Sequence, residues 1–189
     1  MERSRELRTG ETGIAAVELA LILPLLLILV FGIIDFGRLI QASLIVTNVS
    51  REGGSMASRG FKSGVDLLSL LQSSGTPLDL DGLGKIYVSR IKAGTSGAAA
   101  NPSIDQQLSK GGLGISSNIG SGLPHLGLSN ALYQHLVFEN SQQASDIAEI
   151  WVVEVYYKYK PITPLPNFIT TILVTPGYDG RIVGSKSVF

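Results

Sequence analysis

The sequence predicts an α+β fold in which a long N-terminal helix, half of it in a membrane, packs on a small antiparallel β-sheet. Three stretches support this prediction: an apolar run at 14–34, an amphipathic stretch at 35–59 and an alternating pattern at 149–160. The 15 basic and 15 acidic residues cancel, so the charge indicates no nucleic-acid partner. About 155 residues follow the apolar run, which is enough for one compact head at 60–189.

Residues 14–34 have the composition of a transmembrane helix. They would extend roughly 31 Å, which matches a hydrocarbon core of about 30 Å. A cleaved secretory signal is the alternative, but its apolar region is usually about 7 to 15 residues long. The leader at 1–13 carries Arg3, Arg5 and Arg8 close to the membrane, and acids count little in the positive-inside rule. We therefore expect a cytoplasmic N-terminus and an exported head.

Glu18 is an acid near the start of this apolar run. A carboxylate inside the bilayer costs on the order of 2 to 3 kcal/mol, although an acid near the interface can be tolerated. If the chain is cut after Gly13, Ile14 carries a new α-amine about 6 Å, or one helical turn, from Glu18. In a bundle of staggered identical helices, Glu18 could face the amine of a neighbour and so set the register of assembly.

Pro24 predicts a kink inside the anchor, because proline removes a helical hydrogen bond, here to the carbonyl of Ala20. Two interpretations remain open. The kink is harmless, or local melting of the helix lets the subunit leave the bilayer and pack into a filament.

An amphipathic helix continuous with the anchor is predicted for residues 35–59, ending near Gly60. Asp35 and Arg38 are three residues apart and predict an ordinary surface ion pair. The apolar face of this helix is expected to contain Leu39, Ala42, Val46, Val49, Gly53 and Met56.

Two stretches of the head alternate as strands do. Residues 84–92 show an imperfect pattern, whereas residues 149–160 predict a half-buried antiparallel strand. The outer face of that second strand is expected to carry Glu154, Lys158 and Lys160.

The connections and the chain end are predicted from composition. Gly and Ser are frequent over about 94–130, which predicts a long loop or insertion. Three prolines predict a turn or an extended link after the strand at 149–160, residues 168–175 fit a strand or a short helix, and residues 180–189 fit a final edge strand. The three prolines are Pro161, Pro164 and Pro166.

No pattern in the sequence indicates catalysis. The chain has no cysteine, and His125 and His135 lack the spacing of a zinc site. We therefore predict a protein that is not an enzyme, with no metal, no cofactor and no small-molecule substrate.

The stretch "GIAAVELALILPLLLILVFGIIDFGR", which begins at Gly13, resembles the TadE-like family of minor pilins or pseudopilins in bacterial tight-adherence (Tad, Flp) systems. The stretches "NVSREGGSMASRG" from Asn48 and "VVEVYYKYKPITPL" from Val152 are similar to that family's helix end and last long strand. The resemblance implies a type IV pilin-like fold and cleavage by a prepilin peptidase between Gly13 and Ile14.

The same resemblance implies the partners and the location. The partners would be the prepilin peptidase, other Tad pilins and pseudopilins, and the inner-membrane assembly platform. The protein would lie in the bacterial inner membrane and could enter a pilus that serves adherence and secretion. The alternative is an envelope protein that keeps its leader as a signal anchor and binds a ligand or partner through its exported head.

Overall fold

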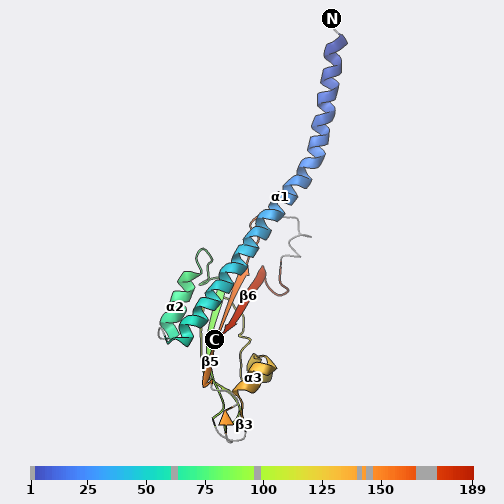
Figure 1. Cartoon of the computed structure of the whole chain (residues 1–189). Coiled ribbons are helices and arrows are strands. Elements are labelled where there is room, and N and C mark those ends of the chain that lie inside the picture. Colours follow the sequence, from blue (N-terminus) through green and yellow to red (C-terminus); the bar gives the residue numbers. More distant parts are fainter. Residues whose placement is uncertain (1–2, 61–63, 96–98, 140–141, 144–146, 165–173) are drawn as a thin grey trace.

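A single long helix, α1 (Arg3–Ser58), carries a compact head at its C-terminal half (Figure 1). The computed structural model describes residues 3–60, 64–95, 99–139, 142–143, 147–164 and 174–189. Within these residues, the head contains α2 (Gly64–Ser74), α3 (Asn130–Leu136), the short helical turn η1 (Pro124–Gly127) and six strands. The predicted α+β fold, a long N-terminal helix packed on a small antiparallel sheet, is confirmed.

Four strands form the main sheet in the order β2-β1-β5-β6. These strands are β1 (Gly84–Lys92), β2 (Ser103–Lys110), β5 (Glu149–Tyr159) and β6 (Arg181–Val188), and every neighbouring pair is antiparallel. A separate two-stranded ribbon consists of β3 (Phe138–Glu139) and β4 (Gln142–Gln143). The strands predicted at 84–92, 149–160 and 180–189 are therefore present, and β6 is the predicted edge strand.

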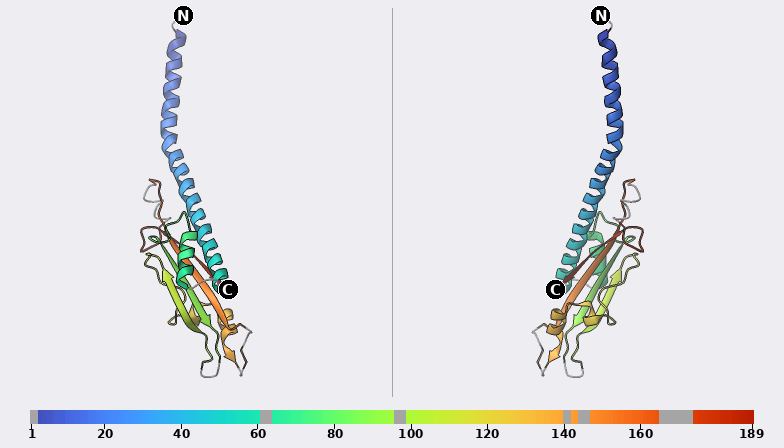
Figure 2. Two further views of the ribbon diagram at one scale, coloured as in Figure 1. Left: turned by 90° about the vertical axis from the view of Figure 1, so that its left-hand side faces the viewer. Right: turned by 90° about the vertical axis from the view of Figure 1, so that its right-hand side faces the viewer.

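The main core lies between the sheet and the C-terminal half of α1. α1 packs against β5 and β6, while α2 packs against β1 and β2 (Figure 2). Apolar residues at helical spacing on α1 meet alternate residues of the central strands, as the amphipathic pattern predicted. The buried residues of this core include Ala42, Val46, Val49, Leu67, Leu71, Ile86, Val88, Val153 and Val155.

Two adjacent glycines allow α1 to approach its neighbours closely. A β-carbon at Gly53 would lie 2.6 Å from a methyl carbon of Leu71, and one at Gly54 would lie 2.1 Å from the ring of Phe189. Since real β-carbons do not approach other atoms so closely, a larger residue at either position would require the side chain of Leu71 or Phe189 to shift. α1 then ends at Ser58, and Gly60 has a positive φ of 64°, close to the predicted helix end.

The strand predicted as half-buried is buried on both faces. A second core covers the face of the sheet that points away from α1 and includes Ile91, Ile119, Leu136 and Val152. Glu154, predicted on a solvated face, is completely buried. The prediction was wrong there because the segment between β2 and α3 folds back over this face of the sheet.

The predicted loop at 94–130 is wrong over residues 103–110, which form β2. This strand has only two apolar residues, Ile104 and Leu108, and it forms through backbone pairing with β1 rather than through an apolar face. Residues 64–74 form the helix α2, which was not predicted, although its Leu67, Leu68 and Leu71 follow helical spacing.

The link after β5 is described up to Pro164, and it has no regular secondary structure from Pro161 to Pro164. Pro166 and most of the segment predicted as a strand or short helix, residues 168–173, lie outside the described residues.

Candidate functional site

The N-terminal half of α1 projects from the head and exposes its apolar side chains. Ile14 is 63% exposed and Leu21 is 75% exposed, although both are apolar. By length and composition, α1 provides one candidate membrane span, and no part of its most apolar window is covered by the rest of the protein. This half of α1 therefore has the surface of a membrane anchor.

The predicted processing and pairing residues all lie on this exposed part of α1. Gly13 and Ile14 are successive helical residues, and Glu18 follows one turn after Ile14 with its side chain exposed. A β-carbon at Gly13 would have no neighbour within 4 Å. The helix continues through Pro24, and its axis changes direction between the projecting half and the half on the sheet (Figure 2). Cleavage after Gly13, pairing of Glu18 and a kink at Pro24 remain predictions.

An apolar stripe continues along α1 beyond the predicted membrane span. Phe36, Ile40 and Leu44 recur every fourth residue and are 58%, 47% and 60% exposed. They lie on one side of the helix, whereas Ala42 and Val46 face the sheet and are buried. We call Phe36, Ile40 and Leu44 the α1 stripe. No residue in the described part of the chain buries it.

Asp35, the first residue of α1 after the predicted span, is hydrogen-bonded to the end of β5 and to the link that follows it. Its carboxylate is fully buried, and one oxygen, Oδ1, accepts hydrogen bonds from the Tyr159 hydroxyl at 2.9 Å and the Ile162 backbone N–H at 3.0 Å. The other oxygen, Oδ2, accepts from the Thr163 backbone N–H at 3.3 Å and from the Thr163 hydroxyl. We call Asp35, Tyr159, Ile162 and Thr163 the Asp35 cluster.

The predicted surface pair between Asp35 and Arg38 is wrong, because Asp35 is directed into this cluster. Burial by itself raises the pKa of Asp35, but the hydrogen bonds from Ile162, Thr163 and Tyr159 outweigh it and lower the pKa below 3.8. Burial and the hydrogen bond to Asp35 raise the pKa of Tyr159 to about 12, against an opposing effect of Arg38.

These pKa values predict how the head responds to pH. The pKa of Asp35 is lowered on folding, so its stabilising effect is present above pH 3.8 and is lost as the pH falls through the lower, folded value. The pKa of Tyr159 rises from 10.0 to about 12, so its effect is present below pH 10.0 and is lost as the pH rises through about 12. Thermal unfolding across pH should show both losses. In Tyr159→Phe, the melting temperature should fall less steeply at both the acid and the alkaline end of the pH range. A pH dependence equal to that of the wild type would contradict these roles of Asp35 and Tyr159.

Glu154 fixes the segment that covers the outer face of the sheet. Its carboxylate accepts hydrogen bonds from the Asn118 backbone N–H at 3.0 Å, the Tyr156 hydroxyl at 2.9 Å and the Ser117 hydroxyl. Burial and the nearby Glu154 charge raise the pKa of Tyr156 and of Tyr87. Glu154 therefore holds the chain at residues 117–118 against β5, which is a structural role and not evidence of acid–base chemistry.

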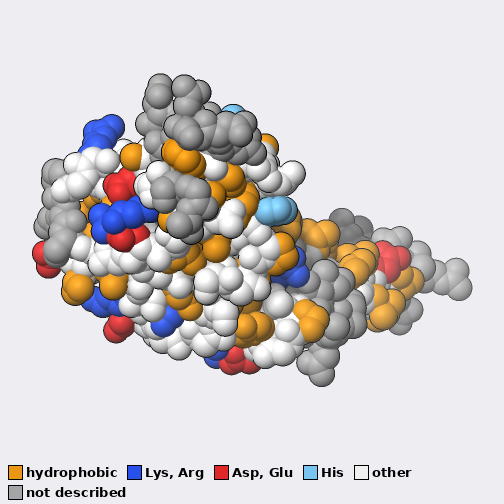
Figure 3. All heavy atoms as spheres, turned by 90° about the horizontal axis from the view of Figure 1, so that it is seen from below, with side chains coloured by type: hydrophobic (Ala, Val, Ile, Leu, Met, Phe, Trp, Pro, Cys, Tyr) orange, Lys and Arg blue, Asp and Glu red, His pale blue; other side chains and the backbone are white. Residues whose placement is uncertain are grey.

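The distal surface of the head carries charges of both signs (Figure 3). Asp105 pairs with Arg90 and with Lys92, the latter at 2.7 Å, while Arg90 also lies 4.0 Å from Glu149. His125 contacts the ring of Tyr133 at a centroid distance of 5.1 Å. Within the described residues, no group of three or more His, Cys, Asp or Glu side chains could hold a metal ion.

The described residues thus form an α+β head carried on one candidate membrane anchor. Residues 13–55 match the family model described as TadE-like protein, which confirms the resemblance seen in the sequence. The chain therefore carries a TadE-like segment that covers the anchor and most of the helix on the sheet. No curated protein and no solved structure matches the chain.

This segment indicates a Tad pilus-associated protein with an N-terminal apolar helix. The TadE-like family is a structural family rather than a family of enzymes, and it implies association with a membrane and with other components of a pilus system. The match ends at residue 55, so the sheet, α2 and the loops of the head lie beyond it.

Proposed function

We propose that the protein is a minor pilin or pseudopilin that helps to assemble a Tad (Flp) type IV pilus for tight adherence and secretion. In this proposal it inserts with its N-terminus in the cytoplasm and its head outside, and a prepilin peptidase cuts it between Gly13 and Ile14. The main support is the exposed apolar half of α1, which lies within the TadE-like segment.

The exposed anchor would hold the subunit in the membrane before assembly. Its apolar side chains would contact lipid, and the backbone groups of the span are bonded within the helix except at Pro24, which has no N–H to donate to the carbonyl of Ala20. The bacterial inner membrane is the location that this proposal requires. The other Tad pilins and pseudopilins and the assembly platform in that membrane would be its partners.

The α1 stripe supports packing against other helices during assembly. Phe36, Ile40 and Leu44 lie beyond the span, where water would otherwise contact them. A neighbouring apolar helix would bury these side chains and the adjoining part of the anchor, and the same surface would pass from lipid contacts to protein contacts. The stripe therefore provides an assembly surface that does not require the head to change its fold.

Cleavage would give Glu18 a partner. The new α-amine of Ile14 would be positively charged, and Glu18 of one subunit could meet the amine of a neighbour in a staggered bundle. Each charge would then be compensated where lipid or apolar side chains exclude water. Glu18 is exposed on the helix, so the fold leaves it accessible to such a neighbour.

Glu18→Ala is expected to leave cleavage largely intact but to reduce incorporation into pili by about tenfold, because an unpaired amine would remain in an apolar bundle. Immunoblots of sheared pili and of membranes would measure incorporation and cleavage separately. Glu52→Ala, an exposed acid on the same helix, is the matched control and should incorporate normally. Normal incorporation of Glu18→Ala would rule out the pairing. Absence of the wild-type chain from both the pili and the assembly complex would contradict the proposed function.

A further inference from the structure

We propose that a cavity beside Arg38 binds the phosphate of an anionic phospholipid and seats the head on the outer surface of the membrane. This inference rests on the membrane orientation in the proposed function, and it assigns a ligand to a part of the head that pilus assembly does not explain. The cavity has a volume of about 260 Å³ and lies where α1 leaves the predicted span.

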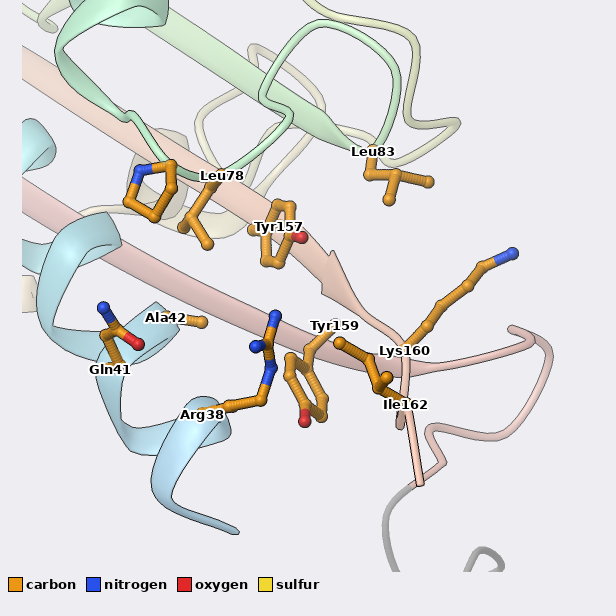
Figure 4. A pocket seen from close by; sticks show the side chains of 10 residues that line it. Arg38, Gln41, Ala42, Leu78, Leu83, Tyr157, Tyr159, Lys160 and Ile162 are labelled. Carbon is orange, nitrogen blue, oxygen red and sulfur yellow. The ribbon is translucent and has the colours of Figure 1, made fainter. Parts of the chain in front are cut away.

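Three parts of the fold form this cavity (Figure 4). α1 contributes Arg38, and the segment before β1 contributes Leu78 and Leu83. The end of β5 contributes Tyr157 and Tyr159, and the side chain of Arg38 points between the helix and these two rings. The cavity therefore combines two cationic groups, Arg38 and Lys160, with apolar and aromatic walls, as a phospholipid headgroup and its first acyl carbons would require.

Arg38 has a charge available for an anion. In the part of the chain that the structure describes, no carboxylate lies within 4.0 Å of its guanidinium, and Asp35 uses its oxygens within the Asp35 cluster. The nearby lysines are already paired, because the ammonium groups of Lys158 and Lys160 lie 2.8 and 2.5 Å from the carboxylate of Asp179. The lining residues include two cations, Arg38 and Lys160, and no carboxylate. This charge favours an anionic lipid over a zwitterionic one.

The position of the cavity relative to the bilayer also favours a lipid over a free anion. Arg38 lies four residues after Ile34, or about 6 Å along the helix, and the headgroup layer on each side of a bilayer is about 5 to 8 Å thick. Ile162 lines the cavity and is 64% exposed, and its backbone is bonded to Asp35 at the end of the span. Ile162 would therefore contact the acyl region while the guanidinium contacts the phosphate.

Native mass spectrometry of the full chain in detergent micelles tests this site with phosphatidylglycerol as the probe. The wild type is expected to retain bound phosphatidylglycerol, whereas Arg38→Gln should bind it about tenfold more weakly, which corresponds to 1.4 kcal/mol. Leu78→Trp should also weaken binding, because it fills the cavity and keeps the charge. Arg51→Gln removes an exposed cation of the same helix away from the cavity and should bind like the wild type.

Competition experiments identify the source of the phosphate. An excess of inorganic phosphate or of phosphatidylcholine should not displace phosphatidylglycerol from the wild type. Displacement by inorganic phosphate would overturn the lipid assignment, and equal binding of the wild type, Arg38→Gln and Leu78→Trp would overturn the site. Neither result would bear on cleavage after Gly13, so the failure of this inference is distinguishable from the failure of the proposed function.

Discussion

Replacing Asp35 by Asn is expected to lower the free energy of unfolding by about 3 kcal/mol, because it breaks a buried, charge-assisted set of hydrogen bonds. The amide keeps the shape of the carboxylate but has one acceptor oxygen instead of two, and its NH₂ group faces donors of Thr163 or Ile162. Urea unfolding of the full chain in detergent micelles would measure the loss. Trp151 in β5 is the only tryptophan and reports on the sheet.

Glu52→Gln is the matched control for this experiment. It neutralises an exposed acid on the same helix, and such surface changes usually alter stability by no more than about 0.5 kcal/mol. If Asp35→Asn changed stability as little as the control does, the Asp35 cluster would not be what holds the end of β5 to α1. A large loss confined to Asp35→Asn would support that role.

Gly13→Val is expected to abolish cleavage, so the chain should stay at full length in the membrane and be absent from pili. This effect differs from misfolding, since Gly13 lies near the N-terminus of α1 and a β-carbon there would meet nothing within 4 Å. The loss would therefore arise at the peptidase. Immunoblots of membrane and pilus fractions would show the size and the location of the chain.

Gly32→Val provides the control, because Gly32 is a second glycine of α1 whose β-carbon would also have no neighbour within 4 Å. It should be cleaved and incorporated as the wild type is. Efficient cleavage of Gly13→Val would contradict the predicted processing site. A block in both variants would instead point to a general effect of valine on insertion of the helix.

The sequence predicts the long helix and the central strands of this fold well, because these elements follow from the periodicity of apolar residues. Val46 and Val49 on α1, and Val153 and Val155 on β5, repeat at the spacing of a helix face and a strand face, and they meet in one core. β1 also follows its predicted range. These elements carry their pattern locally, so no knowledge of distant neighbours is needed to recognise them.

The residues that sequence analysis missed are polar groups whose partners are distant in the chain. Asp35 is bonded to residues 124 to 128 positions away, so its spacing from Arg38 suggested only a local pair. Glu154 alternates with apolar residues as a solvated strand residue does, and only the folded segment at 117–118 shows that it is buried. One available signal was the position of Asp35 directly after the apolar run, where an unpaired buried acid would be costly.

The prediction of a loop at 94–130 was wrong over β2 for a different reason. Composition over a long window averages a strand together with its flanking glycines and serines, so the short polar strand β2 was hidden. An edge strand gains much of its stability from backbone bonds to one neighbour, here β1, and needs little apolar pattern of its own.

The mass of the N-terminal peptide of the chain, isolated from bacteria with an active prepilin peptidase, shows whether the protein is processed as a pilin. We expect a mature protein that begins at Ile14, which leaves Glu18 as its fifth residue. An intact N-terminus beginning at Met1 in assembled protein from such cells would contradict it and would favour an unprocessed, signal-anchored envelope protein.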